Sequence, residues 1–316
     1  MTLPQAPLAD CGAPQTGRAV YLKASDGLTL RAAHWPADGP QSDGAESRHV
    51  MILPGRTEYI EKYGLVIRDL AARGWGAVVI DWRGQGLSDR MAADPRMGHV
   101  GAFADFQRDL TAFQDYADTV APGPKPWLVH SMGGCIGLRG LVNGLTPPAV
   151  AFSAPMLGLN QPAVLTTFIR FLAAAARPFG LDARYAPTTG PEFGLPGMAF
   201  ESNNLTTDRA QFDRMKAQIT DDLRLSLGGP SLRWMAQALA EMDTLAAVPA
   251  PHIPALFGLG GDEAIVSADA IRARCATWPG VELVEYPGAK HELTMERADV
   301  RDDFISRMLT LFTRSL

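Results

Sequence analysis

Hydrophobic residues along this chain fall into two patterns: short continuous apolar runs, and longer segments in which apolar residues recur every three or four positions. The short runs are typical of strands buried on both faces of a parallel sheet, and the spaced segments are typical of amphipathic helices. The predicted strands cover residues 49–53, 76–80, 126–130, 149–152, 255–258 and 281–286. The predicted helices cover residues 60–73, 103–120, 135–142, 232–246, 268–276 and 300–312.

The order of these elements predicts an α/β protein. Strands and helices alternate, which is typical of a mostly parallel central sheet flanked by helices on both faces. Residues 18–35 come before this alternation and indicate an antiparallel hairpin, with a turn at Ser25, Asp26 and Gly27. Residues 36–48 form a polar loop that leads into the first buried strand.

The alternation breaks between residues 155 and 229. This segment contains a mostly apolar helix at 163–176, a proline- and glycine-rich stretch at 187–197 and a polar helix at 208–219. We interpret it as a helical cap (lid) inserted over the sheet. The expected organisation is a flexible N-terminal tail at 1–17, a core at 18–154 and 230–316, and a cap at 155–229.

Composition narrows the classes of function. The 316 residues are 47% hydrophobic and 20% charged, as in ordinary globular proteins. The formal net charge of −5 argues against nucleic acid as a partner, because nucleic-acid binders normally present a basic face.

Cysteine usage and the N-terminal sequence indicate the compartment. Cys11, Cys135 and Cys275 are widely spaced and form neither a metal-type pair nor a disulfide framework. The first residues lack the basic start and apolar centre of a secretory signal, and no run approaches the ~20 apolar residues that span a bilayer. We expect a soluble, cytoplasmic protein whose membrane contact is at most peripheral and transient, at the inner face.

Ser131 is the candidate nucleophile. An apolar run ends at this serine, and Gly133 and Gly134 follow before a helical segment. A strand, a tight turn and a helix with serine at the apex are the context of a nucleophile elbow. The usual pattern is Gly-x-Ser-x-Gly, and Val129 replaces its first glycine, so a buried serine at a strand end stays open as an alternative.

A serine nucleophile needs a histidine base and an acid that orients it. In folds with a nucleophile elbow, the acid follows the serine along the chain and the histidine follows the acid. Of the two later histidines, His252 comes before its strand begins, whereas His291 follows the last strand, at the sheet edge where ligand sites gather. Asp262 and Glu263 both follow the strand at 255–258 and are both candidate acids. A zinc motif starting at His291 would require histidine at 295, and Met295 stands there, so no metal site is expected.

Six motifs follow one another along the chain. They are Pro54-Gly55-Arg56-Thr57-Glu58-Tyr59, Asp81-Trp82-Arg83-Gly84-Gln85-Gly86-Leu87-Ser88, His130-Ser131-Met132-Gly133-Gly134, Asn204-Leu205-Thr206-Thr207-Asp208, Leu227-Gly228-Gly229-Pro230-Ser231 and Gly288-Ala289-Lys290-His291-Glu292. In these motifs the chain resembles the monoacylglycerol lipase and lysophospholipase group of α/β-hydrolases, especially its lysophospholipase L2-like branch, from Arg18 to the C-terminus. That branch accepts a small residue other than glycine at the position of Val129.

The resemblance implies an α/β-hydrolase fold and further roles. The family's spacing from Pro254 favours Glu263 over Asp262 as the acid. It also assigns the oxyanion hole to the backbone N–H groups of Arg56 and Met132. For the Arg56 side chain, an ion pair with Glu58 or Glu61 and a contact with substrate are equally expected.

Two segments have both a structural and a functional interpretation. The turn at 81–88 is expected to be structural, with Asp81 bonding nearby backbone. The apolar helix at 163–176 is either a cap helix packed on the core or a lid over an acyl pocket that also touches a membrane surface.

The resulting hypothesis is a serine hydrolase that cleaves the carboxylic ester bond of a monoacyl lipid through an acyl-enzyme, without a cofactor. Its catalytic residues would be Ser131, Glu263 and His291. A small-ester esterase, a thioesterase or a C–C bond hydrolase of the same fold remains an alternative, as does a ligand-binding receptor with little turnover. A dinucleotide-binding fold is disfavoured, because Gly84 and Gly86 lack the third glycine of that motif.

Overall fold

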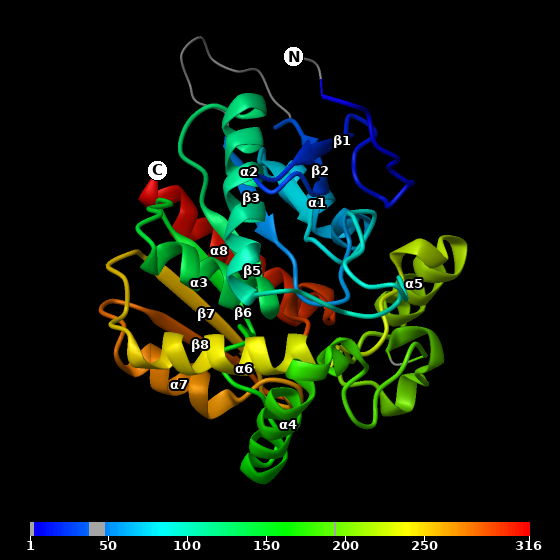
Figure 1. Ribbon diagram of the computed structural model, residues 1–316. Helices are drawn as coiled ribbons and strands as arrows, with labels where there is room; N and C mark the ends of the chain where they lie inside the picture. The colour runs from blue at the N-terminus through cyan, green and yellow to red at the C-terminus, as the bar shows by residue number, and fades with distance from the viewer. Residues whose placement is uncertain (1–2, 38–47, 193) are drawn as a thin grey trace.

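The fold is built on one eight-stranded sheet in the computed structural model, which describes residues 3–37, 48–192 and 194–316 (Figure 1). The strand order is β1-β2-β4-β3-β5-β6-β7-β8. Strands β1 and β2 are antiparallel to their neighbours, and the remaining pairs are parallel. The strands are β1 (Arg18–Lys23), β2 (Thr29–Trp35), β3 (His49–Leu53), β4 (Gly76–Asp81), β5 (Trp127–His130), β6 (Val150–Ser153), β7 (Ala255–Gly260) and β8 (Glu282–Tyr286).

Helices cover both faces of this sheet because its central strands are apolar on both sides. On one face, α2 (Phe106–Val120), α3 (Met132–Val142), α6 (Leu232–Ala247) and α7 (Ala268–Ala276) contribute to one hydrophobic core. On the other face, α1 (Gly64–Ala71) and α8 (Ala298–Ser315) contribute to a second core. The α/β-hydrolase arrangement expected from the sequence, a mostly parallel sheet flanked by helices, is confirmed.

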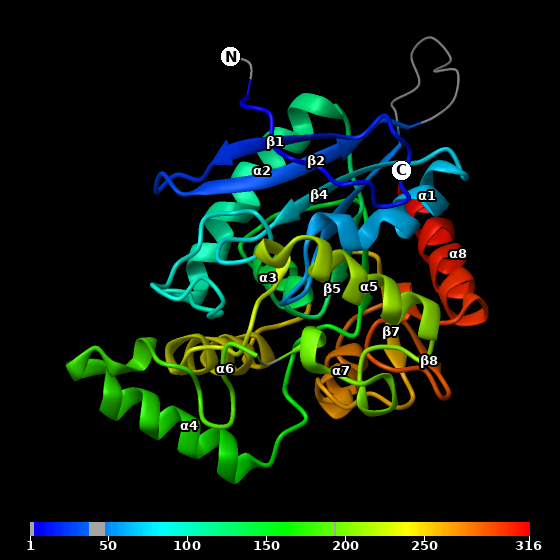
Figure 2. The ribbon, with the colours of Figure 1, turned by 90° about the vertical axis from the view of Figure 1, so that its right-hand side faces the viewer.

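The segment between β6 and α6 carries α4 (Ala163–Ala176), α5 (Arg209–Asp221) and several short 3-10 turns. Both views place α4 at the outside of the molecule beside α6, far from β1 and β2 (Figures 1 and 2). Only Ile169 and Ala173 of α4 are buried, so one narrow stripe of this helix packs and the rest is half-buried or exposed.

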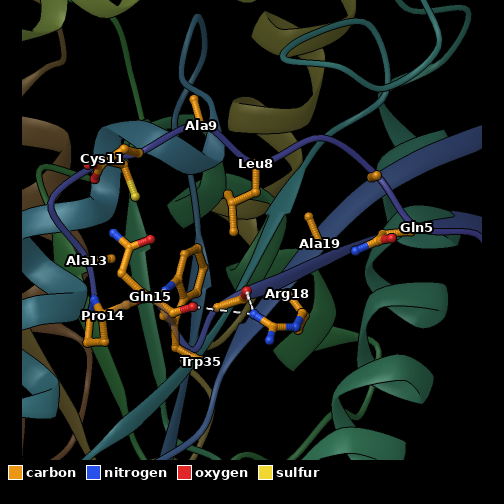
Figure 3. Close-up of a pocket in the computed structure, with 13 residues that line it drawn as sticks. Gln5, Leu8, Ala9, Cys11, Ala13, Pro14, Gln15, Arg18, Ala19 and Trp35 are labelled. Atoms are coloured by element: carbon orange, nitrogen blue, oxygen red, sulfur yellow. Dashed lines mark hydrogen bonds between the residues drawn. The ribbon is translucent and has the colours of Figure 1, made fainter.

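Residues 3–17, which we expected to be a flexible tail, make defined contacts. Ala6 N–H donates to Ala19 O (2.9 Å), and Tyr21 N–H donates to Pro4 O (2.8 Å). The Trp35 indole donates to Pro14 O (3.0 Å), and a small cavity of about 270 Å³ lies between these residues and the start of β1 (Figure 3). This cavity contains none of the expected catalytic residues.

Most predicted helices and strands appear within one to three residues of their expected bounds, but one start is instructive. We predicted a helix from Cys135, whereas α3 begins at Met132, directly after Ser131. The two glycines that indicated a turn belong to the helix. Glycine is needed at 133 because a Cβ there would overlap the carbonyl oxygens of Leu53 and Pro54. The predicted helix at 60–73 begins as a 3-10 turn (Ile60–Tyr63) and continues as α1.

The polar loop predicted at 36–48 lies mostly outside the described residues. Among the described helices, none is long and apolar enough to cross a membrane.

Candidate active site

Ser131 sits at a sharp turn between β5 and α3. Its backbone has φ 48° and ψ −115°, a conformation that non-glycine residues rarely adopt. Such strain persists only where the surrounding structure enforces it, and it is typical of functional sites. The helix that follows directs its positive dipole end toward the serine.

Val129 departs from the usual elbow pattern, and the structure shows how its side chain is accommodated. Val129 is fully buried in β5, and a Cβ added at Gly137 of α3 would lie 3.2 Å from Val129 Cγ1. The missing glycine of the strand is therefore matched by a glycine of the helix, which leaves room for the valine methyl group.

His291 and Glu263 are hydrogen-bonded to each other. His291 Nδ1 lies 2.7 Å from Glu263 Oε2. The other carboxylate oxygen, Oε1, accepts from the N–H groups of Ile265 (2.7 Å) and Val266 (3.1 Å). Burial alone would raise the pKa of Glu263, but the bond to His291 and these backbone donors outweigh it and lower the pKa.

Asp262, the other candidate acid, is exposed. Its backbone N–H donates to Ala289 O (2.9 Å), so the backbone of this residue secures the turn after β7. The structure therefore pairs His291 with Glu263, the residue favoured by the family's spacing.

Ser131 and His291 line the same cavity, which has a volume of about 520 Å³. Both the core and the segment at 155–229 contribute to it. Most of its lining is apolar and includes Met156, Leu159, Leu165, Ile169, Ile219, Leu227, Trp234, Met235, Ile265 and Val266. Apolar walls suit a hydrocarbon chain, because they exclude water from the serine.

The two expected oxyanion donors belong to two segments next to Ser131. Met132 is the first residue of α3, and the first N–H groups of a helix have no partner within it. Arg56 lies on the loop after β3, and Gln85 secures this loop by donating to Gly55 O (2.8 Å) and accepting from Thr57 N–H (3.3 Å). A Cβ added at Gly55 would lie 3.1 Å from Ser131 Cβ, so this loop passes close to the serine.

A buried charged cluster that was not predicted from the sequence lies at the cavity and is formed by Glu58, Lys62 and Glu292. Lys62 Nζ lies 2.5 Å from Glu58 Oε1 and 2.6 Å from Glu292 Oε1. The Tyr63 hydroxyl donates to Glu58 (2.7 Å), and the His130 ring lies beside the His291 ring, with centroids 4.8 Å apart and the ring planes tilted by 56°. The i,i+4 spacing of Glu58 and Lys62 was the available signal.

The pKa values of the two carboxyl groups in this cluster shift in opposite directions. Burial raises the pKa of Glu292 despite the opposing charge of Lys62. For Glu58, the effect of burial is overcome by Lys62 and His130, and the pKa falls to about 2. Burial also lowers the pKa of His130 to about 4, so this ring is neutral near pH 7.

Glu58, His130 and Glu292 are the described side chains whose ligand atoms lie close enough, within 4.8 Å, to hold a metal ion. The Lys62 ammonium already bonds both carboxylates. This cation occupies the place that a metal ion would take, which disfavours a metal centre.

Asp81 has the structural role that we expected. Its carboxylate accepts from the N–H groups of Ile60 (2.9 Å) and Leu87 (2.8 Å). It also pairs with the fully buried Arg31 at 2.7 Å, and Arg31 binds Glu61 with two further bonds. This network ties the turn after β4 to the segment that precedes α1.

Comparison with known proteins identifies the family of this chain. The family model described as serine aminopeptidase, S33, matches residues 44–298. Lysophospholipase L2 of Escherichia coli strain K12 is 34% identical over 282 residues, which cover 84% of this chain and 81% of that protein. A probable lysophospholipase L2 of Haemophilus influenzae is 26% identical over 83% of this chain and 82% of its own length.

Among solved structures, a soluble variant of monoglyceride lipase from Saccharomyces cerevisiae, crystallised with a substrate analogue, superposes with a TM-score of 0.70. The two chains are 18% identical, and the match covers 96% of this chain and 98% of that one. At this identity the likeness shows the fold.

These matches define the class of protein as an α/β-hydrolase. Within that class the chain belongs to the serine aminopeptidase S33 family, and it is similar to the lysophospholipases L2 that its motifs resembled.

Proposed function

We propose that this protein is a serine hydrolase that cleaves the carboxylic ester bond of a monoacyl lipid. The observation that carries the proposal is that His291, which is hydrogen-bonded to Glu263, lines one largely apolar cavity together with the strained Ser131. The lysophospholipase relatives support a monoacyl lipid as the substrate class.

The chemistry follows from the hydrogen-bond pattern. Because Glu263 accepts from His291 Nδ1, the other ring nitrogen, Nε2, is free to take the Ser131 proton. The serine oxygen attacks the acyl carbonyl, and the N–H groups of Arg56 and Met132 stabilise the negative charge that forms on the carbonyl oxygen. His291 then gives the proton to the leaving alcohol, which departs and leaves an acyl-enzyme.

A water molecule completes the reaction. His291 takes a proton from this water, the resulting hydroxide attacks the acyl carbonyl, and the serine recovers its proton as the fatty acid leaves. The Glu263 carboxylate holds the imidazole in the required tautomer and stabilises its positive charge in both steps. The cycle uses no cofactor.

Residues 155–229 act in this proposal as a cap over the acyl site. Leu165 and Ile169 of α4 reach the cavity, while Val164, Phe168 and Phe171 of the same helix are exposed. An exposed apolar face on a helix is typical of contact with a membrane surface. The cap would therefore both shelter the acyl chain and bring the site to lipid.

Two experiments test the proposal. A fluorophosphonate probe should label the wild type and not Ser131→Ala; equal labelling or none in the wild type would contradict a serine hydrolase. Nitrophenyl esters from acetyl to palmitoyl should be cleaved best at long chain lengths. A maximum at acetyl or butyryl would favour a small-ester esterase instead.

Membrane contact is tested with the double variant Phe168→Ser, Phe171→Ser. It should bind less to vesicles of phosphatidylglycerol and phosphatidylcholine in a flotation assay. Because these side chains are exposed, hydrolysis of a soluble short ester should change little. Unchanged flotation would argue against contact through α4.

A further inference from the structure

The Arg56 side chain is placed as a cation at the cavity. Its guanidinium lies 5.2 Å from the Trp234 ring centroid, and Nη2 donates to Gly228 O (2.6 Å). A Cβ added at Gly98 would lie 3.2 Å from Arg56 Cζ, so backbone covers the guanidinium as well. Arg56 and Trp234 both line the cavity that contains Ser131.

This cation has no counter-charge among the described residues. We expected an ion pair with Glu58 or Glu61 as one of two options. Glu58 bonds Lys62 and Tyr63, and Glu61 bonds Arg31. Lys62, which also lines the cavity, is held between two carboxylates. Arg56 therefore contributes an uncompensated positive charge.

The guanidinium is also short of hydrogen-bond acceptors. Its Nε is buried and has no partner among the described residues. Burial lowers the pKa of Arg56 to about 10, which still leaves the group charged near neutral pH. Arg56 as a whole is half-buried. A cation partly removed from water without a carboxylate is costly to maintain, and a bound anion would relieve that cost.

We propose that the Arg56 guanidinium binds the phosphodiester of the substrate head group, so that lysophospholipids are preferred over monoacylglycerols. This inference rests on the proposed function. A phosphodiester fits the observations because guanidinium donors match phosphate oxygens in charge and geometry. The monoacylglycerol carries only hydroxyl groups at that end and leaves the cation unpaired.

A structural role for Arg56 and a different anion are the competing explanations. The bond to Gly228 O links the loop after β3 to the cap segment, so the only role of the Arg56 side chain could be to hold these two segments together. The carboxylate of the fatty-acid product is a second source of oxyanion. The experiment separates both from a head-group phosphate.

The test compares two substrates with one acyl chain. We would measure kcat/KM for 1-octanoyl lysophosphatidylethanolamine and 1-octanoylglycerol, both below their micellar concentrations, with wild type, Arg56→Met and Arg56→Lys. The ratio of the two values is the readout, because any effect on the shared ester chemistry or on folding cancels in it. We expect Arg56→Met to lower this ratio by about 10- to 100-fold, the usual effect of losing a charged hydrogen bond. Arg56→Lys keeps the charge and should recover part of the ratio.

A second measurement uses inhibitors in place of substrates, with wild type and Arg56→Met. The uncleavable ether analogues 1-O-octyl lysophosphatidylethanolamine and 1-O-octylglycerol compete with a nitrophenyl ester. The phosphodiester analogue should inhibit at a concentration at least about tenfold lower than 1-O-octylglycerol. Octanoate serves as the third inhibitor. If Arg56→Met weakened inhibition by octanoate and not by the phosphodiester analogue, the bound anion would be the product carboxylate and the inference would be wrong.

The inference fails if the substrate ratio changes by less than threefold in Arg56→Met, if wild type prefers 1-octanoylglycerol, or if the two ether analogues inhibit equally. Those outcomes leave the proposed function intact. Failure of wild type to cleave either lipid and to react with the fluorophosphonate would instead remove the proposed function.

Discussion

Replacing Glu263 by glutamine tests the central contact of the site. The glutamine amide can sit in two orientations. In the first, its nitrogen faces His291 Nδ1, at the 2.7 Å contact that the carboxylate makes now, and its oxygen still accepts from Ile265 and Val266. In the second, the amide nitrogen faces those two backbone N–H groups, and both buried bonds are lost.

The magnitude follows from this choice. Losing two hydrogen bonds costs about 1–3 kcal/mol, so the first orientation should predominate by about 5- to 150-fold. In that orientation Nδ1 must accept a hydrogen bond, so the imidazole proton moves to Nε2. A protonated Nε2 cannot take the Ser131 proton. A wrong tautomer of this kind lowers kcat by about 10⁴ in a serine protease, so we expect a loss of about 10³–10⁴ here.

The assay is nitrophenyl octanoate hydrolysis at pH 8, with thermal unfolding to show that the variant folds. Asp262→Asn is the matched control, since its side chain is exposed one residue away, and it should stay within threefold of wild type. If Asp262→Asn lost as much activity, or if Glu263→Gln kept more than a tenth of kcat, the assignment of the acid would be refuted.

Three further predictions concern stability, all measured by denaturant unfolding. Arg31→Met should cost about 3–5 kcal/mol, because it leaves the buried carboxylates of Asp81 and Glu61 without their cation; a loss below 1 kcal/mol would contradict this. Val129→Gly should cost about 2–4 kcal/mol, because it empties a fully buried site, and an unchanged midpoint would show that the valine is not needed for packing. Burial raises the pKa of Glu292 above its ordinary 4.5, so its contribution to stability is present at low pH and is lost as pH rises through the raised value. Glu292→Gln stays neutral and should gain stability relative to wild type as pH rises above 4.5; a difference that does not vary with pH would argue against the raised pKa.

Local patterns in the sequence were enough to predict the fold. The apolar runs at 49–53 and 76–80 became β3 and β4, because a run that is apolar on both faces can only be buried inside a layered structure. The helix at 163–176 was predicted with its observed bounds, although only Ile169 and Ala173 of this helix are buried. Glycine was ambiguous: the Gly133-Gly134 pair indicated a turn, and the structure uses it for close approach of helix and strand.

The candidate site was only partly predictable. The sequence predicts Ser131 and His291 at one edge of the sheet, because each follows the end of a predicted strand. The choice between Asp262 and Glu263 could not be made from the residues alone, because adjacent carboxylates on a turn differ only in the direction of their side chains.

What the sequence alone determined is therefore the set of helices and strands and the residues at the strand ends, since these depend on short-range periodicity. The tertiary structure decided which side chains meet. Lys62 and Glu292 are 230 residues apart, and the carboxylates that were candidates to neutralise Arg56 bind Lys62 and Arg31 instead. Ion pairing of this kind depends on distances of a few ångströms between segments far apart in the chain, and only packing sets those distances.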